Sequence, residues 1–302
     1  IAGFPSKGYS QETGQITGIR GNDVTFTLLR GTYDSESIPP DNGGTARWKG
    51  LNVSNVEIRR NTMSKPDAWN AFVNPKGWME LKDCVNCTVD GNYFYAGKHS
   101  GVALTPRNQT AADPWSKVDN FVFTNNIVRN YSVGLITQGA DDLHVSLAGN
   151  PQITMRNNLF ISPSGEAPAA FLSVYDGKLL AKNVSVTHNT IIQPGTMLSA
   201  TGVTEGDFIF KDNIVGNGEY GIQCFVNPSN IYSCLPGLQM QGNVIIGEPL
   251  GGRPYCTDLG SVVYPTGNNC VRDSSQVGFV DLAGDNYRLG PGSPFKGRAT
   301  DG

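Results

Sequence analysis

The chain has 302 residues, with 23 basic and 26 acidic side chains, so its formal net charge is −3. This balance argues against nucleic-acid binding, which needs a basic surface. No run of about 18 apolar residues occurs, so we expect no membrane span. The 37 glycines and 18 prolines, with few helix-forming windows, favour a turn-rich all-β fold.

The first 50 residues contain clusters of glycine and proline and one predicted strand, Val24–Arg30. We expect residues 1–50 to form a first coil or a cap. The terminal units of a repeat structure need such a covering because they have a neighbour on one side only.

A nine-residue pattern then recurs seven times between residues 55 and 245. Asparagine holds its seventh place in every copy, at intervals of 31, 34, 32, 31, 24 and 30 residues. Apolar side chains hold places two, four and nine. The copies begin at Asn55, Asn86, Asn120, Gln152, Asn183, Asp207 and Gly237.

This pattern predicts a β-solenoid. Apolar residues two positions apart have the period of a strand, with both side chains on one face. The asparagine stands where the strand must turn, since asparagine tolerates the left-handed conformation and its amide can bond equivalent amides in stacked coils. Leucine-rich repeats need a denser leucine pattern, and propeller blades need about 40 residues. The sequence therefore predicts a right-handed parallel β-helix of about seven to eight coils over residues 51–246.

A second strand is predicted between successive copies, for example at 78–83, 101–108 and 134–139. Leu81, Leu104 and Ile136 are expected to point inward. The expected outward places are Glu80 and Lys82, Ala103 and Thr105, and Leu135 and Thr137. Because adjacent coils lie about 4.8 Å apart, outward side chains should form ladders, and polar ladders make a binding groove.

Residues 247–302 are rich in proline and glycine and are predicted to form a capping tail. We expect this tail to lie along the last coils and to cover an open sheet edge. The three segments together are predicted to make one structural domain.

The six cysteines allow fifteen pairings. Local closure favours Cys224–Cys234 and Cys256–Cys270, with Cys84 and Cys87 left as a tight pair or as free thiols. Zinc is the alternative, but the one Cys-x-x-Cys has no second ligand pair nearby, so no metal ligands are assigned. Disulfides indicate an oxidising compartment, so a secreted or cell-surface location is expected.

Two parts of the sequence resemble the right-handed parallel β-helix repeat superfamily. The stretches Val56-EIRRN, Met79-ELKD, Val89-DGNYF, Thr105-PRNQ, Pro114-WS and Phe123-TNNIVRN are similar to a group of secreted bacterial β-helix proteins. The stretch Gly278-FVDLAGDNYRLGPGSPFKG is similar to the closing segment of many such proteins. The resemblance covers about residues 50–302. It implies the fold, but the superfamily includes lyases, hydrolases, epimerases, adhesins and phage tail proteins.

Charged side chains on the predicted ladders suit an acidic polysaccharide. β-Elimination needs a base for the C5 proton and a cation that neutralises the uronate carboxylate. The candidates for these roles are Lys82, His99, Arg107 and Tyr175. The candidates for additional substrate contacts are Glu80, Lys98 and Asp176. The alternative is that these residues form a solvated, mutually paired face.

Hydrolysis would instead use two carboxyl groups, about 5–5.5 Å apart for retention or 6.5–9.5 Å for inversion. Asp141 and Asp142 resemble the adjacent Asp pair of β-helix polygalacturonase-type hydrolases. However, the Gly-His-Gly and Arg-Ile-Lys motifs of that family are absent, and ordinary loop chemistry is the alternative.

No cofactor is required by these mechanisms, and Ca²⁺ is the ion that the carboxylates would suit. Its oxygen ligands would come from Asp83, Asp90, Asp141, Asp142 or Asp176. No EF-hand loop is present. His188 is expected to point outward beside Asn189, with no ligand role.

Trp69 and Trp115 fall in long polar loops, where the wall of a glycan groove would be built, although loop anchors are the alternative. The predicted function is cleavage of an acidic polysaccharide by an extracellular lyase or hydrolase. The alternative is a non-catalytic secreted or surface protein that binds glycan or assembles with copies of itself. A monomer and end-to-end or lateral self-association both stay open.

Overall fold

A computed structural model describes residues 11–20, 23–29, 45–47, 54–64, 78–95, 100–104, 118–138, 152–162, 170–175, 183–203, 206–218, 220–247 and 264–301. The chain divides into two compact units, Ile1–Asn52 and Val53–Gly302. In the first unit, β1 (Gln11–Arg20) pairs antiparallel with β2 (Asp23–Leu29) and parallel with β3 (Thr45–Arg47). The strand predicted at 24–30 is thus present as β2.

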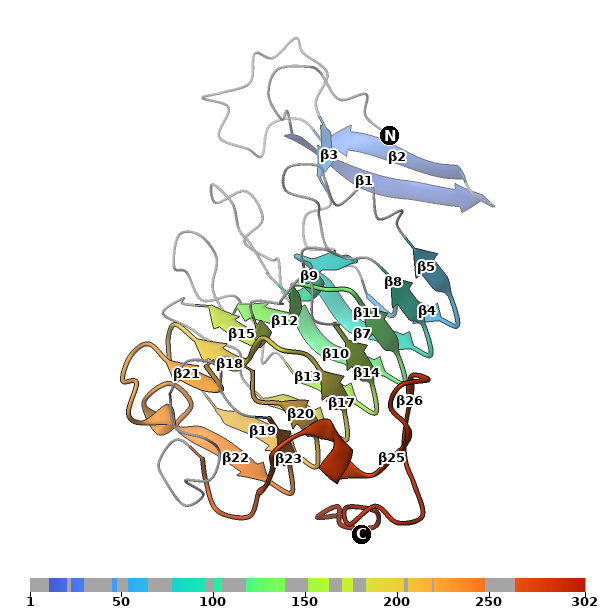
Figure 1. Cartoon of the computed structure of the whole chain (residues 1–302). Helices are drawn as coiled ribbons and strands as arrows, with labels where there is room; N and C mark the ends of the chain where they lie inside the picture. The colour runs from blue at the N-terminus through green and yellow to red at the C-terminus, as the bar shows by residue number, and fades with distance from the viewer. Residues whose placement is uncertain are drawn as a thin grey trace. The chain divides into compact units, whose positions relative to one another are not determined.

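The second unit is a parallel β-helix, as the repeat predicts, and Figure 1 shows its strands stacked coil upon coil. Each nine-residue copy forms one strand of a first sheet and one strand of a second sheet. Within the described residues the first sheet comprises β4 (Glu57–Arg59), β7 (Cys84–Asp90), β10 (Val118–Thr124), β13 (Ile153–Arg156), β16 (Val184–Thr187), β19 (Asp207–Lys211) and β22 (Gly237–Gln241).

The second and third sheets complete the coils. Among the described residues the second sheet comprises β5 (Thr62–Ser64), β8 (Tyr93–Tyr95), β11 (Ile127–Arg129), β14 (Leu159–Ile161), β17 (Thr190–Ile192), β20 (Ile214–Gly216), β23 (Val244–Ile246) and β24 (Asn269–Val271). The third sheet there comprises β6 (Met79–Leu81), β9 (Ser100–Leu104), β12 (Val133–Gln138), β15 (Ala170–Tyr175), β18 (Thr196–Ala200) and β21 (Ile222–Cys224).

The core is filled by the apolar places of the repeat. Phe121 and Phe123 of β10 are buried, and in-register pairing places Ile153 and Met155 of β13 beside them. The rings of Phe123 and Phe160 lie 6.1 Å apart, so aromatic packing continues from coil to coil.

The asparagine of place seven forms a buried ladder, as predicted. Asn158 shows the pattern: its Nδ2 donates to Oδ1 of Asn189 (2.9 Å) and to the carbonyl oxygen of Phe123 (2.8 Å). Its own Oδ1 accepts from the backbone N–H of Asn126 at 2.9 Å. The buried place-seven members of the ladder are Asn92, Asn126, Asn158, Asn189, Asn213 and Asn243. The exposed Asn61 stands at one end, and Asn268, which follows the last copy, extends the ladder at the other.

The left-handed conformation, however, falls one residue earlier than predicted. The residues at place six have positive φ, for example 57° at Asn125 and 54° at His188. The chain must reverse before place seven, because the amide of place seven has to face into the stack to bond its neighbours. The place-six residues are Arg60, Gly91, Asn125, Asn157, His188, Asp212 and Gly242.

In β12 of the third sheet, the predicted inward and outward positions are wrong by one residue. Leu135 and Thr137 are buried, not outward. They pair with Val102 and Leu104 of β9, which are also buried. Since side chains alternate along a strand, a shift of one position exchanges every inward and outward place. Glu80 is exposed, as predicted.

Disulfides are present, as predicted. Cys84 bonds Cys87, and Cys224 bonds Cys234. Cys270 is also disulfide-bonded, while Cys256 lies outside the described residues. In the described part of the chain no helix has the length and apolar character needed to cross a membrane.

The tail extends the second sheet and then crosses its outward face. β24 pairs with β23. The chain continues through a 3-10 turn, η4 (Ser274–Val277), and a hairpin of β25 (Phe279–Asp281) and β26 (Asn286–Leu289). The apolar residues of this contact are Ile192, Ile214, Val244, Ile246, Val271, Val277, Phe279, Leu289 and Phe295.

Candidate functional site

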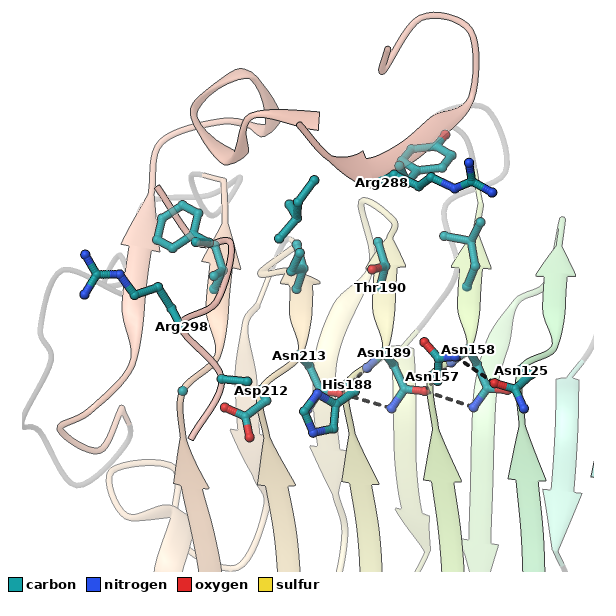
Figure 2. A pocket seen from close by; sticks show the side chains of 18 of the residues that line it. Asn125, Asn157, Asn158, His188, Asn189, Thr190, Asp212, Asn213, Arg288 and Arg298 are labelled. Carbon is teal, nitrogen blue, oxygen red and sulfur yellow. Dashed lines mark hydrogen bonds between the residues drawn. The ribbon is translucent and has the colours of Figure 1, made fainter. Parts of the chain in front are cut away.

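A polar row runs along the turn between the first and second sheets. Asn125 donates from Nδ2 to Oδ1 of Asp90 at 2.7 Å, and Asn157 donates to Oδ1 of Asn125 at 2.7 Å. His188 and Asp212 occupy the same place in the next two coils. Figure 2 shows Asn125, Asn157 and His188 in line below the tail. We call Asn125, Asn157, His188 and Asp212 the edge ladder.

The end of the tail meets the edge ladder in a compact cluster. His188 Nε2 lies 2.8 Å from Oδ2 of Asp301, and Arg156 lies 3.6 Å from the same oxygen. The hydrogen bond to His188 lowers the pKa of Asp301. Asp212 accepts from the backbone N–H of Thr300 (2.8 Å) and from its hydroxyl (2.7 Å). His188, Asp212 and Asp301 thus bring three potential ligand atoms within 4.8 Å of one another.

A cavity of about 870 Å³ lies between the tail and the second sheet, and the edge ladder lines one side of it. The sheet contributes mostly apolar side chains to its floor, and the tail covers it (Figure 2). The floor residues are Ile127, Leu159, Thr190, Ile214 and Val244. The tail residues are Tyr287, Arg288, Leu289, Phe295 and Arg298. A volume of this size is typical of small-ligand sites.

The outward face of the first sheet is mostly polar, with Val122 and Ile209 among its outward residues. Arg59 is held between Glu57 and Asp90, each at 3.0 Å. The pKa of Asp90 is lowered, first by hydrogen bonds from Asn125 and Thr124 and then by Arg59. Asp90, a predicted calcium ligand, is therefore already bonded to three side chains.

Two cations on this face lie two coils apart. Pairing aligns Arg156 with Thr187 and Thr187 with Lys211. The side chain of Arg156 is 57% exposed. Lys211 donates to Oε1 of Gln239, a neutral group, at 2.8 Å. We call Arg156, Thr187 and Lys211 the cationic row.

Of the predicted site residues, Glu80 and Lys82 lie together. Oε1 of Glu80 is 3.9 Å from Nζ of Lys82, and both side chains are partly exposed. Tyr175 ends β15, paired with Gln138 of β12. The other predicted site residues lie outside the described residues, namely Trp69, Lys98, His99, Arg107, Trp115, Asp141, Asp142 and Asp176.

The sequence analysis did not single out the edge ladder as a candidate site. No ligand role is expected for His188 from the sequence. In the structure its ring nitrogen lies within 4.8 Å of carboxylate oxygens of Asp212 and Asp301. The signal was present: His188 and Asp212 both directly precede the ladder asparagine of their copies. Nothing in the repeat pattern predicts the contact with Asp301, because that residue comes from the tail.

No protein family matches the chain, and neither a characterised protein nor a solved structure shows significant similarity to it. The function therefore has to be argued from the geometry of these surfaces.

Proposed function

We propose that the protein is an extracellular carbohydrate-binding β-helix protein that holds an acidic polysaccharide across the outward face of the first sheet. The observation that carries this proposal is the cationic row beside the edge ladder. Equivalent side chains of adjacent coils repeat at about 4.8 Å, so the face offers regularly spaced contacts to a polymer.

The chemistry of the face fits a uronate-containing chain. Lys211 and Arg156 supply charge for carboxylates, and the guanidinium of Arg156 is 57% exposed while it lies 3.6 Å from Asp301. A guanidinium binds a carboxylate through paired hydrogen bonds. Thr187 lies between them and can donate to or accept from sugar hydroxyls. Arg59 contributes less to ligand binding, because Glu57 and Asp90 already neutralise it. The disulfides support the extracellular part of the proposal.

Cleavage of the polymer is the second candidate function. It is favoured by the Glu80–Lys82 pair, which places an amine and a carboxylate side by side on the outward side of the third sheet. The amine of Lys82 is a candidate base for β-elimination once it has lost its proton.

The binding test compares uronate-containing and neutral polysaccharides in affinity electrophoresis at two salt concentrations. We expect retention by the acidic polymers only, and less of it at high salt. The double variant Arg156→Ala/Lys211→Ala should bind at least about thirtyfold more weakly, since each of the two lost charged hydrogen bonds contributes about 1 kcal/mol or more. The matched control is Arg272→Ala/Lys296→Ala, which removes the same charge from exposed positions of the tail.

Equal retention of the wild type and the double variant would refute the cationic row as the binding surface. The same samples test cleavage through absorbance near 235 nm and through new reducing ends. If unsaturated product forms, Lys82→Ala should abolish it without changing retention. Bound polymer that stays intact identifies a binding protein only.

A further inference from the structure

The His188, Asp212 and Asp301 cluster brings together ligands from three segments of the chain. His188 follows β16, Asp212 follows β19 in the next coil, and Asp301 belongs to the tail. Their ligand atoms lie within 4.8 Å of one another. A zinc ion with bonds of about 2.0–2.1 Å would need these atoms about 3.3 Å apart. His188 and Asp301 are already at 2.8 Å, so small side-chain rotations complete the arrangement.

The surroundings of Asp212 keep its carboxylate in place and leave room beside it. Thr300 bonds both carboxylate oxygens and orients them. In the next coil, Gly242 has a φ of 71°, and a Cβ at that position would lie 2.1 Å from Oδ1 of Asp212. A larger residue there would displace the carboxylate from its position.

The cavity is a second observation that points to a ligand here. His188 and Asp212 are both half-buried and line the cavity of about 870 Å³, so an ion held by them would have coordination positions open to that space. A surface patch of acidic groups would have no such space behind it.

The charges of the cluster also favour a cation. Two carboxylates this close repel each other unless a positive charge lies between them. Arg156 reaches Asp301, but in the described part of the chain Asp212 forms no ion pair. A divalent ion would neutralise both carboxylates together.

We propose that His188, Asp212 and Asp301 bind one divalent transition-metal ion, preferentially Zn²⁺, which fastens the tail to two successive coils. An imidazole with two carboxylates suits Zn²⁺ better than Ca²⁺, because Ca²⁺ prefers oxygen ligands alone. The metal site differs from the first-sheet face that would hold the polysaccharide, and the two share one contact, the 3.6 Å approach of Arg156 to Asp301.

The test is calorimetric titration of the full chain, freed of metal by a chelator, with Zn²⁺, Mn²⁺ and Ca²⁺ salts. We expect one Zn²⁺ per chain, weaker binding of Mn²⁺ and the weakest binding of Ca²⁺.

The substitutions His188→Ala, Asp212→Asn and Asp301→Asn should each weaken Zn²⁺ binding at least tenfold. The two asparagine variants keep the size of the side chain and its capacity to accept hydrogen bonds. The matched control is Asp207→Asn, which removes a carboxylate five residues before Asp212 and should leave binding unchanged.

A second readout follows the tail. Zinc should slow proteolysis within residues 290–301 in the wild type and in Asp207→Asn, but not in Asp301→Asn. The proposal is overturned if the wild type binds no Zn²⁺, or if the three cluster variants bind it as tightly as the control. Polysaccharide retention by the wild type, measured in the presence of chelator, tests the proposed function separately from metal binding.

Discussion

Arg129 donates from its guanidinium to the carboxylate of Asp285 at 2.8 Å, although 156 residues separate them in the chain. Arg129 ends β11 on the second sheet, and Asp285 lies in the turn of the tail hairpin. Tyr287 donates its hydroxyl to the other oxygen of the same carboxylate at 2.9 Å. This pair therefore ties the hairpin across the coils.

Loss of Arg129 should loosen the tail without unfolding the β-helix. In Arg129→Ala, amide protons of β26 should exchange about tenfold faster, because the hairpin opens locally while the core stays packed. The melting temperature should change by less than about 3 °C, since partly exposed ion pairs contribute little. Hydrogen exchange by mass spectrometry makes the comparison, with Arg288→Ala as the control. Unchanged exchange in β26 would contradict this role for Arg129.

Deprotonation of Tyr287 should open the same hairpin in alkali. Burial, and then the hydrogen bond to Asp285, raise the pKa of Tyr287 to about 12. Because this pKa is above that of the unfolded chain, the stabilisation is complete below about pH 10 and is lost as the pH rises towards 12. Ultraviolet titration of the phenolate should resolve this tyrosine. Asp285→Asn should lower its pKa only in part, since burial is the larger cause.

The buried asparagine ladder should contribute more to stability than the exposed one beside it. Asn158→Ala leaves the N–H of Asn126 and the carbonyl of Phe123 without a side-chain partner, and should cost about 3 kcal/mol. Asn157→Gly removes only an exposed bond to Asn125 and retains the left-handed backbone, so it should cost less than about 1 kcal/mol. Urea unfolding followed by circular dichroism and by fluorescence measures both. Equal losses would contradict the distinction.

The Cys224–Cys234 disulfide should stabilise the chain more than Cys84–Cys87 does. It closes the longer loop, with a separation of 10 residues against 3. Loop-closure entropy then predicts losses of about 3 and about 2 kcal/mol for the Ala/Ala double variants. All four cysteines are buried, so the packing loss is similar in both pairs. Calorimetric unfolding of the two double variants ranks them, and the reverse order would show that native-state strain outweighs the entropy.

The site illustrates the limits of reading this sequence by its repeat. The pattern predicts that Asn158 and Asn189 stack, because equivalent places of successive copies must be neighbours in a solenoid. The invariant asparagine of place seven drew the prediction of positive φ to that place, although place six carries glycine in two copies and asparagine in two others. Place six takes the positive φ because the side-chain amide of place seven has to point inward to bond the equivalent amides of neighbouring coils.

Strand register in the third sheet was harder to predict for a related reason. This part of the sequence is not covered by the nine-residue copies, so no repeated place identifies the inward side. Leu135 and Thr137 are inward because they align with Val102 and Leu104 of the preceding coil. That alignment depends on the lengths and conformations of the turns that lead into β9 and β12.

The sequence by itself therefore determined the parallel β-helix, its buried asparagine ladder and the Cys224–Cys234 disulfide. These features depend on contacts between equivalent or nearby positions, which a repeat and a short spacing reveal. Only the tertiary structure decided that the tail crosses the second sheet and brings Asp285 to Arg129 and Asp301 to His188. Such contacts join segments more than 100 residues apart that share no pattern, and chain packing alone brings them together.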